Sequence, residues 1–403
     1  MNDAVTLALI ISSVIIVIGF LSNWLFDRTG LPDMLFLIAL GVVVGPVLRI
    51  FNPASLFELA PYIAAVALVF ILFDGGLRMN LYQVFSESPR AALLAIMGFA
   101  FTTIVIALVM HLIVGVPLLY GVLFGSILGG SSSIVVVSLA RRIGVSERCS
   151  TVLTLESAIT DILCIVVSLV VIGIITSPSG QAQYLEIGKE IAGKFSIGAV
   201  VGVIFGIIWL SLLKKVANIP YAYMLTLAVV LSAYSVSDVL GGSGALSSLL
   251  FGIVLGNEKD ILKIFKQDST RDTIIDAGLK RFESEIAFLV RSFFFVYLGL
   301  ITTVSDIGLI VFGAILSFLL LGVRYLAVRL ATIRSEMCEE RSIMNFVLTR
   351  GLAAAVLSTL PIQYNLLYSD LYINISLVVI ISTAVICTAG IMALSYKRKK
   401  RQG

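Results

Sequence analysis

The sequence predicts an all-α polytopic membrane protein that crosses the bilayer about thirteen times. Its 403 residues are 59% hydrophobic and 13% charged, with a mean hydropathy of +1.09, far from the values of soluble domains. Apolar runs long enough to span a bilayer recur along almost the whole chain. Two of these runs are interrupted at matching positions, which indicates an inverted repeat of two six-helix halves.

The apolar runs define the predicted spans, each with ends uncertain by a few residues. In chain order they cover residues 4–25, 32–50, 56–77, 91–114, 118–140, 150–176, 191–213, 221–238, 243–257, 284–302, 306–333, 342–360 and 373–395. The first run lacks a basic segment before it and a small-residue cleavage site after it. We therefore expect a retained helix there and not a signal peptide.

The spans divide into two halves around one spacer helix. The first half is predicted at 1–190, with core helices at about 91–176, the spacer at 191–215 and the second half at 216–396. Within the second half, lysines alternate with apolar residues at the start of the polar stretch 258–283, which predicts an amphipathic helix on the cytoplasmic membrane surface. Residues 397–403 form a short basic tail.

The positions of Lys and Arg predict the orientation. Nearly all basic clusters, including residues 397–401, fall on one side of the thirteen-span topology, so the C-terminus is expected in the cytoplasm and the N-terminus outside the plasma membrane. The net charge of +4 is spread over short loops, and no nucleic-acid partner is expected. The cysteines show no CxxC spacing, so neither a disulfide nor a thiolate metal site is expected.

Both interruptions lie near the centre of a span. The fifth span contains Gly129-Gly130-Ser131-Ser132-Ser133, and the twelfth contains Thr349-Arg350-Gly351. Each is the fifth span of its half. Matched breaks of this kind indicate a binding site near the midplane, where unwound backbone offers carbonyls to a cation and helix ends to charges. The simpler alternative is that Gly and Ser allow helices to pack closely.

Two carboxylates lie in the sixth span, 150–176. Asp161 falls near the midplane, where ionised groups are costly and mark ion or proton pathways. At about 100° per residue, Ser157 and Asp161 share one helix face, and Glu156 and Thr160 share the adjacent one. The alternative is that one carboxylate holds a neighbouring helix through an arginine.

Arg350 is the partner that we expect for Glu156. It is the only basic residue identified near the centre of a predicted span, and a guanidinium in hydrocarbon needs a carboxylate. This structural ion pair would leave Asp161 as the single carboxylate free to bind either a proton or a hard monovalent cation. Competition of the two for one carboxylate is sufficient for exchange.

These residues resemble the monovalent cation:proton antiporter superfamily, and within it the NhaP-type sodium/proton exchangers. The likeness rests on Glu156-Ser157-x-x-Thr160-Asp161, on the two interruptions, on Phe293-Phe-Phe-Val-Tyr-Leu-Gly299 and on Phe73-Asp74-Gly75-Gly76-Leu77-Arg78. It implies an NhaA/NhaP-like fold, a homodimer with a mobile core, and exchange of Na⁺, or of K⁺ or Li⁺, for H⁺ without a cofactor.

The resemblance also implies a role for each site residue. Asp161 corresponds to the essential aspartate, Ser157 to the cation-binding serine, and Ser131, with Ser132 beside it, to the backbone carbonyl ligand of the first break. Glu156 and Arg350 correspond to the ion pair. Asp74, expected at the cytoplasmic end of the third span, would attract cations in a funnel; loop capping is the alternative.

Two departures from the family pattern bear on the transported ion. The position before the aspartate is usually Asn or Asp, whereas Thr160 cannot carry a second charge, and electroneutral exchange is therefore expected. The first break usually reads Thr-Asp-Pro in the NhaP group, whereas Ser131-Ser132-Ser133 looks more like the potassium-linked Kef-type branch. Na⁺ is the first expectation, and a K⁺/H⁺ antiporter or a Kef-like K⁺ efflux pathway is the alternative.

Other function classes are less favoured. A channel would need a repeated selectivity motif. An organic-anion symporter would need a roomier site with exposed helix N-termini. No enzyme is expected, because the sequence shows no nucleophile–base pair, metal-ligand cluster or phosphate loop.

Overall fold

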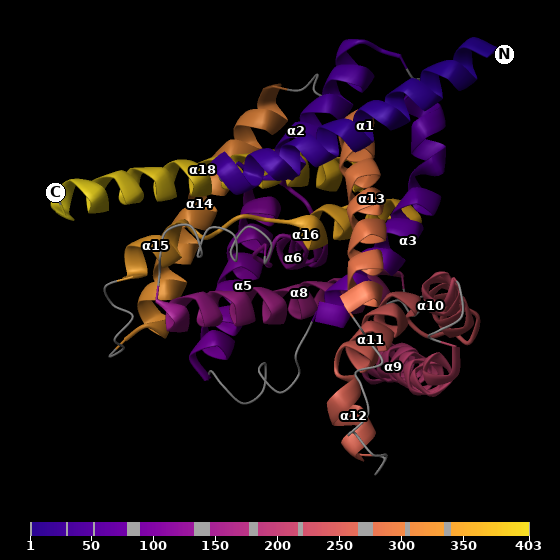
Figure 1. Cartoon of the computed structure of the whole chain (residues 1–403). Helices are drawn as coiled ribbons and strands as arrows, with labels where there is room; N and C mark the ends of the chain where they lie inside the picture. The colour runs from indigo at the N-terminus through magenta and orange to yellow at the C-terminus, as the bar shows by residue number, and fades with distance from the viewer. Residues whose placement is uncertain are drawn as a thin grey trace. The chain divides into compact units, whose positions relative to one another are not determined.

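The structure, a computed structural model, describes residues 2–29, 31–50, 53–78, 89–132, 146–176, 184–216, 221–264, 277–302, 307–333 and 340–402 (Figure 1). All regular structure in these ranges is helical. Eight of the described helices are long and apolar enough to cross a membrane. The predicted class, an all-α multi-pass membrane protein, is confirmed. The count of thirteen spans and the inverted repeat stay predictions.

The described helices follow the predicted spans in order. Those before residue 180 are α1 Asn2–Thr29, α2 Asp33–Val42, the π-helical turn η1 Val43–Val47, α3 Pro53–Arg78, α5 Pro89–Val109, the π-helical turn η2 Met110–Val114, α6 Leu118–Ile127 and α8 Glu147–Thr176. The later ones are α9 Tyr184–Val216, α10 Ala222–Val239, α11 Gly244–Gly256, α12 Glu258–Ile264, α13 Ala277–Ile301, α14 Ile307–Ala331, α15 Arg341–Phe346, α16 Leu352–Leu357, α17 Leu360–Gln363 and α18 Ser369–Gln402.

The chain divides into two compact units. The first unit comprises Met1–Pro61, Ser88–Ile175 and Ser292–Gly403, and the second comprises Tyr62–Glu87 and Thr176–Arg291. Each unit therefore draws on both of the predicted sequence halves. The division of the sequence into a first half at 1–190, a spacer helix at 191–215 and a second half at 216–396 stays a prediction.

Helix α6 is held close to α5 in the first unit. A Cβ added at Gly121 would lie 2.8 Å from the carbonyl oxygen of Ala107, and one at Gly125 would lie 2.6 Å from that of Thr103. Only glycine permits this close approach of the two backbones. The approach positions the C-terminal end of α6, where the first interruption begins. Helix α5 also packs against α14, which in turn packs against α18.

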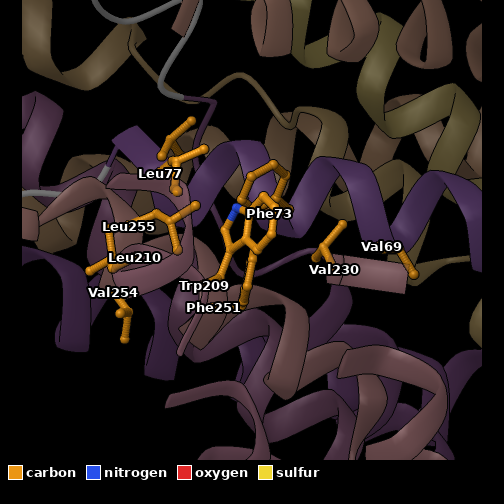
Figure 2. Close-up of a cluster of buried hydrophobic side chains, with 10 residues drawn as sticks. Val69, Phe73, Leu77, Trp209, Leu210, Val230, Phe251, Val254 and Leu255 are labelled. Carbon is orange, nitrogen blue, oxygen red and sulfur yellow. The ribbon is translucent and has the colours of Figure 1, made fainter. Parts of the chain in front are cut away.

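The second unit has its own hydrophobic core (Figure 2). Trp209 of α9 lies at its centre beside Phe73 of α3 and Phe251 of α11, and the Phe73 and Phe251 ring centroids are 5.5 Å apart. The indole Nε1 donates to Thr226 Oγ1 at 3.0 Å, so the one polar atom of this ring has a partner. This core joins α3, α9, α10 and α11.

The start of the first predicted interruption and both ends of the second are seen. Helix α6 ends at Ile127, and residues 129–132 have no regular structure, while Ser133 lies outside the described residues. In the second interruption α15 ends at Phe346, residues 347–351 are irregular, and α16 begins at Leu352. Unwound backbone at membrane depth is tolerated only where protein or water satisfies its polar groups.

The predicted amphipathic segment 258–283 is wrong at its end. It begins with the short helix α12, but its last residues already belong to α13, which starts at Ala277 and not at residue 284. Packing explains the early start, because Phe282 contacts Tyr223 of α10 with ring centroids 6.1 Å apart, and Glu283 is buried. Residues 265–276 lie outside the described ranges.

Candidate ion-binding site

The two interrupted segments meet in the first unit. The backbone N–H of Ser132 donates to the carbonyl of Thr349 at 2.8 Å, so each segment satisfies a polar group of the other. The N–H of Arg350 donates to Thr383 Oγ1 of α18 at 3.2 Å. All four residues are buried. This contact places the broken ends of two helices side by side.

Gly351 makes the close contact possible, and its replacement tests the crossing. In Gly351→Ala the new Cβ would lie 2.6 Å from Ser132 Oγ and 3.2 Å from Ser132 Cα, so one segment must move. We expect a loss of about 1–3 kcal/mol in unfolding free energy and slower ion exchange. Thermal unfolding and vesicle transport measure the two effects.

Gly322→Ala on α14 is the matched control, because a Cβ there meets no atom within 4 Å. This variant should match the parent protein in both measurements or be slightly more stable. Equal behaviour of the two variants would contradict a tight crossing.

One face of α8 binds the first interrupted segment. The Ser157 hydroxyl donates to the Ser131 carbonyl at 2.7 Å, and the Ser131 N–H donates to Thr160 Oγ1 at 3.2 Å. The Thr160 hydroxyl in turn donates to the Ser157 carbonyl, one turn back on its own helix, at 3.0 Å. The structure therefore brings together three of the residues that the sequence predicts, and Thr160 holds the segment by hydrogen bonds.

Asp161 adjoins the same segment from the next position of α8. Its Oδ1 lies 3.5 Å from the point that a Cβ on Gly130 would occupy, and Cys164 Sγ lies 2.9 Å from that point. Within the described residues, no hydrogen bond or ion pair reaches the Asp161 carboxylate. It is the carboxylate of the site without a fixed counter-charge.

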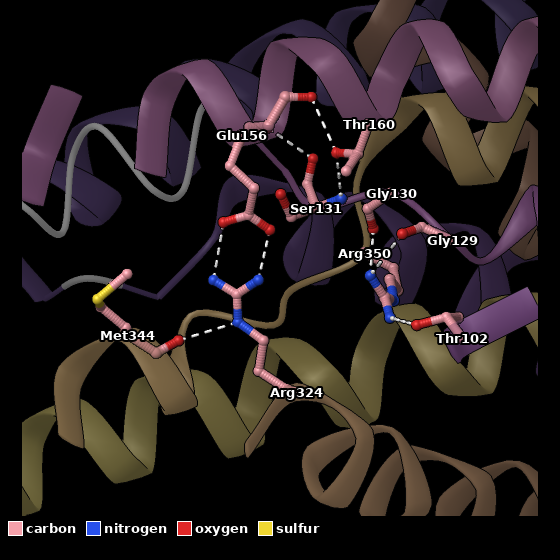
Figure 3. A network of polar contacts seen from close by, with 10 residues as sticks. Thr102, Gly129, Gly130, Ser131, Glu156, Thr160, Arg324, Met344 and Arg350 are labelled. Carbon is pink, nitrogen blue, oxygen red and sulfur yellow. Dashed lines mark hydrogen bonds and ion pairs between the residues drawn. The ribbon is translucent and has the colours of Figure 1, made fainter. Parts of the chain in front are cut away.

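Glu156 pairs with Arg324 of α14, and the predicted Glu156–Arg350 pair is wrong (Figure 3). The two guanidinium Nη groups each donate to one carboxylate oxygen, with Nη2 and Oε2 2.8 Å apart. Arg324 Nε donates to the Met344 carbonyl at 3.0 Å. Both charged side chains are buried, and the bidentate geometry suits a guanidinium with a carboxylate. Glu156 thus forms an ion pair, but with Arg324 and not with Arg350.

Arg350 instead forms hydrogen bonds with the backbone of the first interrupted segment. Its Nη1 donates to the Gly130 carbonyl and, at 3.4 Å, to the Gly129 carbonyl, while Nη2 lies 3.5 Å from Thr102 Oγ1 (Figure 3). Gly129 and Gly130 lie in the irregular segment after α6, which ends at Ile127, so helical hydrogen bonds do not satisfy their carbonyls. The Arg350 guanidinium supplies donors to these buried carbonyls.

Arg324 is the site residue that the sequence analysis missed. It lies well inside the predicted span 306–333, but Arg329 follows closely, so both could be taken for residues near a membrane surface. Helical periodicity distinguishes them, because the buried face of α14 includes Ser317, Leu320, Arg324 and Ala327, whereas Arg329 is exposed. An arginine on the buried face of a span predicts a carboxylate partner.

A small cavity is lined by both residues of the ion pair and by Arg350. It has room for about one water molecule. Ser131 Oγ and Arg350 Nε, which both belong to residues lining the cavity, have no hydrogen-bond partner among the described residues. The other polar lining residues are Thr102, Glu156, Thr160 and Arg324. Two guanidinium groups and the Glu156 carboxylate thus line this cavity, whereas Asp161 does not.

The remaining predicted site residues lie as follows. Ser132 is buried, with its side chain next to Gly351. Asp74 is partly buried near the end of α3 in the second unit, and its predicted funnel role stays a prediction. Among the described residues, no group of three or more His, Cys, Asp or Glu side chains could hold a metal ion. Cys149, Cys164 and Cys387 are buried and form no disulfide.

The fold and site together define a multi-pass helical membrane protein with two interrupted helices that meet beside a carboxylate without a fixed counter-charge. The chain matches the family described as "Sodium/hydrogen exchanger, transmembrane" over residues 12–394, and it belongs to this family. The resemblance seen in the sequence is thereby confirmed.

Named relatives include exchangers of two ions. The chain is 26% identical over 399 residues to "K(+)/H(+) antiporter NhaP" of Alkalimonas amylolytica, covering 95% of this chain and 65% of the relative. It is 24% identical over 350 residues to "Na(+)/H(+) antiporter NhaH" of Halobacillus dabanensis, covering 83% and 84%. The chain therefore spans just under two thirds of the length of the first of these relatives.

Solved structures support the fold. The sodium proton antiporter MjNhaP1 from Methanocaldococcus jannaschii at pH 8 matches with a TM-score of 0.78 and 21% sequence identity, over 97% of this chain and 98% of that chain. A second structure of the same protein, from electron microscopy, matches with a TM-score of 0.73. These likenesses establish the NhaP-like helical fold.

Proposed function

We propose that the protein is a secondary active antiporter that exchanges one monovalent cation for one proton at Asp161. The observation that carries the proposal is that only one of the two carboxylates on α8 has a positively charged partner. Glu156 is neutralised by Arg324, whereas Asp161 has no partner among the described side chains. A carboxylate in that position binds either a proton or a cation, and competition between them couples the two fluxes.

The cation ligands that we propose are the Asp161 carboxylate, the Ser157 hydroxyl and the Ser131 carbonyl, with Ser132 and Thr160 beside them. Oxygen ligands of this kind suit hard cations. The hydrogen bond from Ser157 to Ser131 supports the grouping because it holds two of the ligands 2.7 Å apart. Thr160 positions the Ser131 backbone and contributes no charge.

The charge of the site supports electroneutral exchange. Glu156, Arg324 and Arg350 keep their charges through the proposed cycle, and Asp161 is neutralised either by a proton or by a monovalent cation. The site then has the same net charge in both loaded states. The cation-loaded site and the proton-loaded site therefore carry the same charge when they cross the membrane in opposite directions. One complete exchange cycle moves no net charge.

We predict that the exchange rate does not depend on the membrane potential. The measurement is uptake into proteoliposomes whose potential is clamped at several values while the pH gradient is held constant. A rate that rises steeply with voltage would contradict the one-for-one stoichiometry without contradicting antiport itself.

Na⁺ and K⁺ are the cations that we propose first, with Li⁺ as a further substrate. The relatives named above include both a Na⁺/H⁺ and a K⁺/H⁺ antiporter, and the serine-rich break at 131–133 supports K⁺. The deciding experiment is dissipation of a preset pH gradient in proteoliposomes after separate addition of Na⁺, K⁺ or Li⁺. Absence of a response to all three would refute the antiporter proposal.

A homodimer in the plasma membrane, with its N-terminus outside and its C-terminus in the cytoplasm, completes the proposal. The resemblance to the exchanger family supports the dimer, and the positions of the basic residues support the orientation. Cysteine labelling from each side of intact cells tests the orientation, and the mass of the detergent-solubilised protein tests the dimer.

A further inference from the structure

Two residues on the wall of the small cavity each have a buried polar atom without a hydrogen-bond partner among the described residues. These atoms are Arg350 Nε and Ser131 Oγ, and the two residues are 6% and 3% exposed. A donor or hydroxyl that leaves water without gaining a new partner costs free energy. Because the two residues belong to different interrupted segments, a ligand that satisfies both atoms also joins the segments.

The cavity has the size and the lining of a site for one water molecule. It has room for about one water, and a buried water needs two to four polar partners. Thr102, Thr160 and Glu156 line the same cavity and offer further acceptors (Figure 3). Thr160 Oγ1 accepts from the Ser131 N–H and donates to the Ser157 carbonyl, so it can still accept a second hydrogen bond.

The charges on the wall exclude an alkali cation from this cavity. Two guanidinium groups, those of Arg324 and Arg350, line it together with one carboxylate, that of Glu156, so positive charge is in excess. A chloride ion suits the excess charge, but it is larger than a water molecule and is repelled by the carboxylate. Water is neutral and both accepts and donates, as the lining atoms require.

We propose that this cavity binds one ordered water molecule, which accepts hydrogen bonds from Arg350 Nε and Ser131 Oγ and thereby links the two interrupted segments. Its own two protons are donated to acceptors on α8, the Glu156 carboxylate and Thr160 Oγ1. The water also fixes the orientation of the Ser131 carbonyl, a proposed cation ligand. This last consequence rests on the antiport proposed above, whereas the water site itself does not.

Ser131→Ala tests the water site, because a wet and a dry cavity predict opposite signs for its effect. The backbone carbonyl is retained. With a bound water the variant loses a hydrogen bond, so the Tm of the purified full chain should fall by roughly 2 °C. Without one, only an unsatisfied buried hydroxyl is removed, and the Tm should stay the same or rise. An unchanged or higher Tm would therefore overturn the proposal.

Ser376→Ala is the matched control. Ser376 Oγ on α18 is also buried without a partner among the described residues, but Ser376 does not line this cavity. The control should keep or exceed the parent Tm, and an equal loss in both variants would overturn the water site. All three proteins are heated in sodium chloride and in sodium gluconate. A loss in Ser131→Ala that occurs in chloride and vanishes in gluconate would assign the cavity to an anion and also overturn it.

A structure of the parent protein at a resolution that shows ordered solvent is the second measurement, and it needs no variant. One solvent peak is expected within about 3 Å of both Arg350 Nε and Ser131 Oγ. Well-defined side chains around the cavity with no such peak would contradict the proposal.

The effect on the cation is measured in proteoliposomes. Ser131→Ala should need about five times more cation for half-maximal exchange, while the maximal rate is retained. An unchanged half-maximal concentration would overturn the positioning role of the water. Absence of exchange in the parent protein would refute the antiport instead, and the Tm and the solvent peak would still decide the water site.

Discussion

Replacement of Asp161 by Asn is expected to abolish cation/proton exchange. Asparagine keeps the size of the side chain but can neither release a proton nor neutralise a cation. Glu156 cannot take over, because both of its oxygens are bound by Arg324. The measurement is the pH response of proteoliposomes to Na⁺, K⁺ and Li⁺, with the amount of inserted protein determined in parallel.

The control is Asp238→Asn, which removes an exposed carboxylate near the end of α10 in the second unit. It should exchange at the rate of the parent protein. Asp161→Asn should also remain folded, since no hydrogen bond or ion pair to Asp161 within the described residues is lost. Residual exchange in Asp161→Asn would show that another group carries the proton and would contradict the single-carboxylate mechanism.

Breaking the Glu156–Arg324 pair is expected to cost about 3–5 kcal/mol of stability, because either single substitution leaves the other charge buried and without its partner. Glu156→Gln and Arg324→Met should each lower the Tm strongly. The double variant E156Q/R324M should recover most of the loss, because no uncompensated charge remains. The measurement is a double-mutant cycle in unfolding free energy or, where unfolding is irreversible, in Tm.

The same cycle with Arg350→Met separates the two arginines. Arg350 donates to the Gly129 and Gly130 carbonyls and not to Glu156, so E156Q and R350M should be nearly additive. Arg350→Met should itself destabilise the core, because these buried carbonyls lose their donors. Strong coupling of Glu156 with Arg350, and weak coupling with Arg324, would contradict the structure.

Local patterns were sufficient for much of the site. The apolar runs predict the spans, the Gly-Ser and Thr-Arg-Gly strings predict the two interruptions, and helical periodicity places Ser157, Thr160 and Asp161 beside one another. The structure adds how they are used, because Thr160 accepts from the Ser131 N–H and Ser157 donates to the Ser131 carbonyl. The threonine before the aspartate therefore contributes hydrogen bonds to the site, although it contributes no charge.

Local patterns were insufficient where a choice between distant partners was needed. Glu156 could reach an arginine in either of two later predicted spans, and the sequence does not give the distances between spans. The start of α13 failed for a related reason, since contacts of Phe282 with another helix extend it beyond its apolar run. The error at Glu156 arose at a charged residue, because a buried charged side chain has few acceptable partners and the sequence does not rank them.

By itself the sequence determined the class of protein, the two broken helices and the carboxylate on which exchange is proposed to depend. These follow from the cost of burying a charge or an unsatisfied backbone group in hydrocarbon, which a single chain shows directly. Only the tertiary structure decided that Glu156 binds Arg324 and that Arg350 binds the Gly129 and Gly130 carbonyls beyond α6. The reason is physical: an ion pair forms where two side chains meet, and helix packing decides which ones meet.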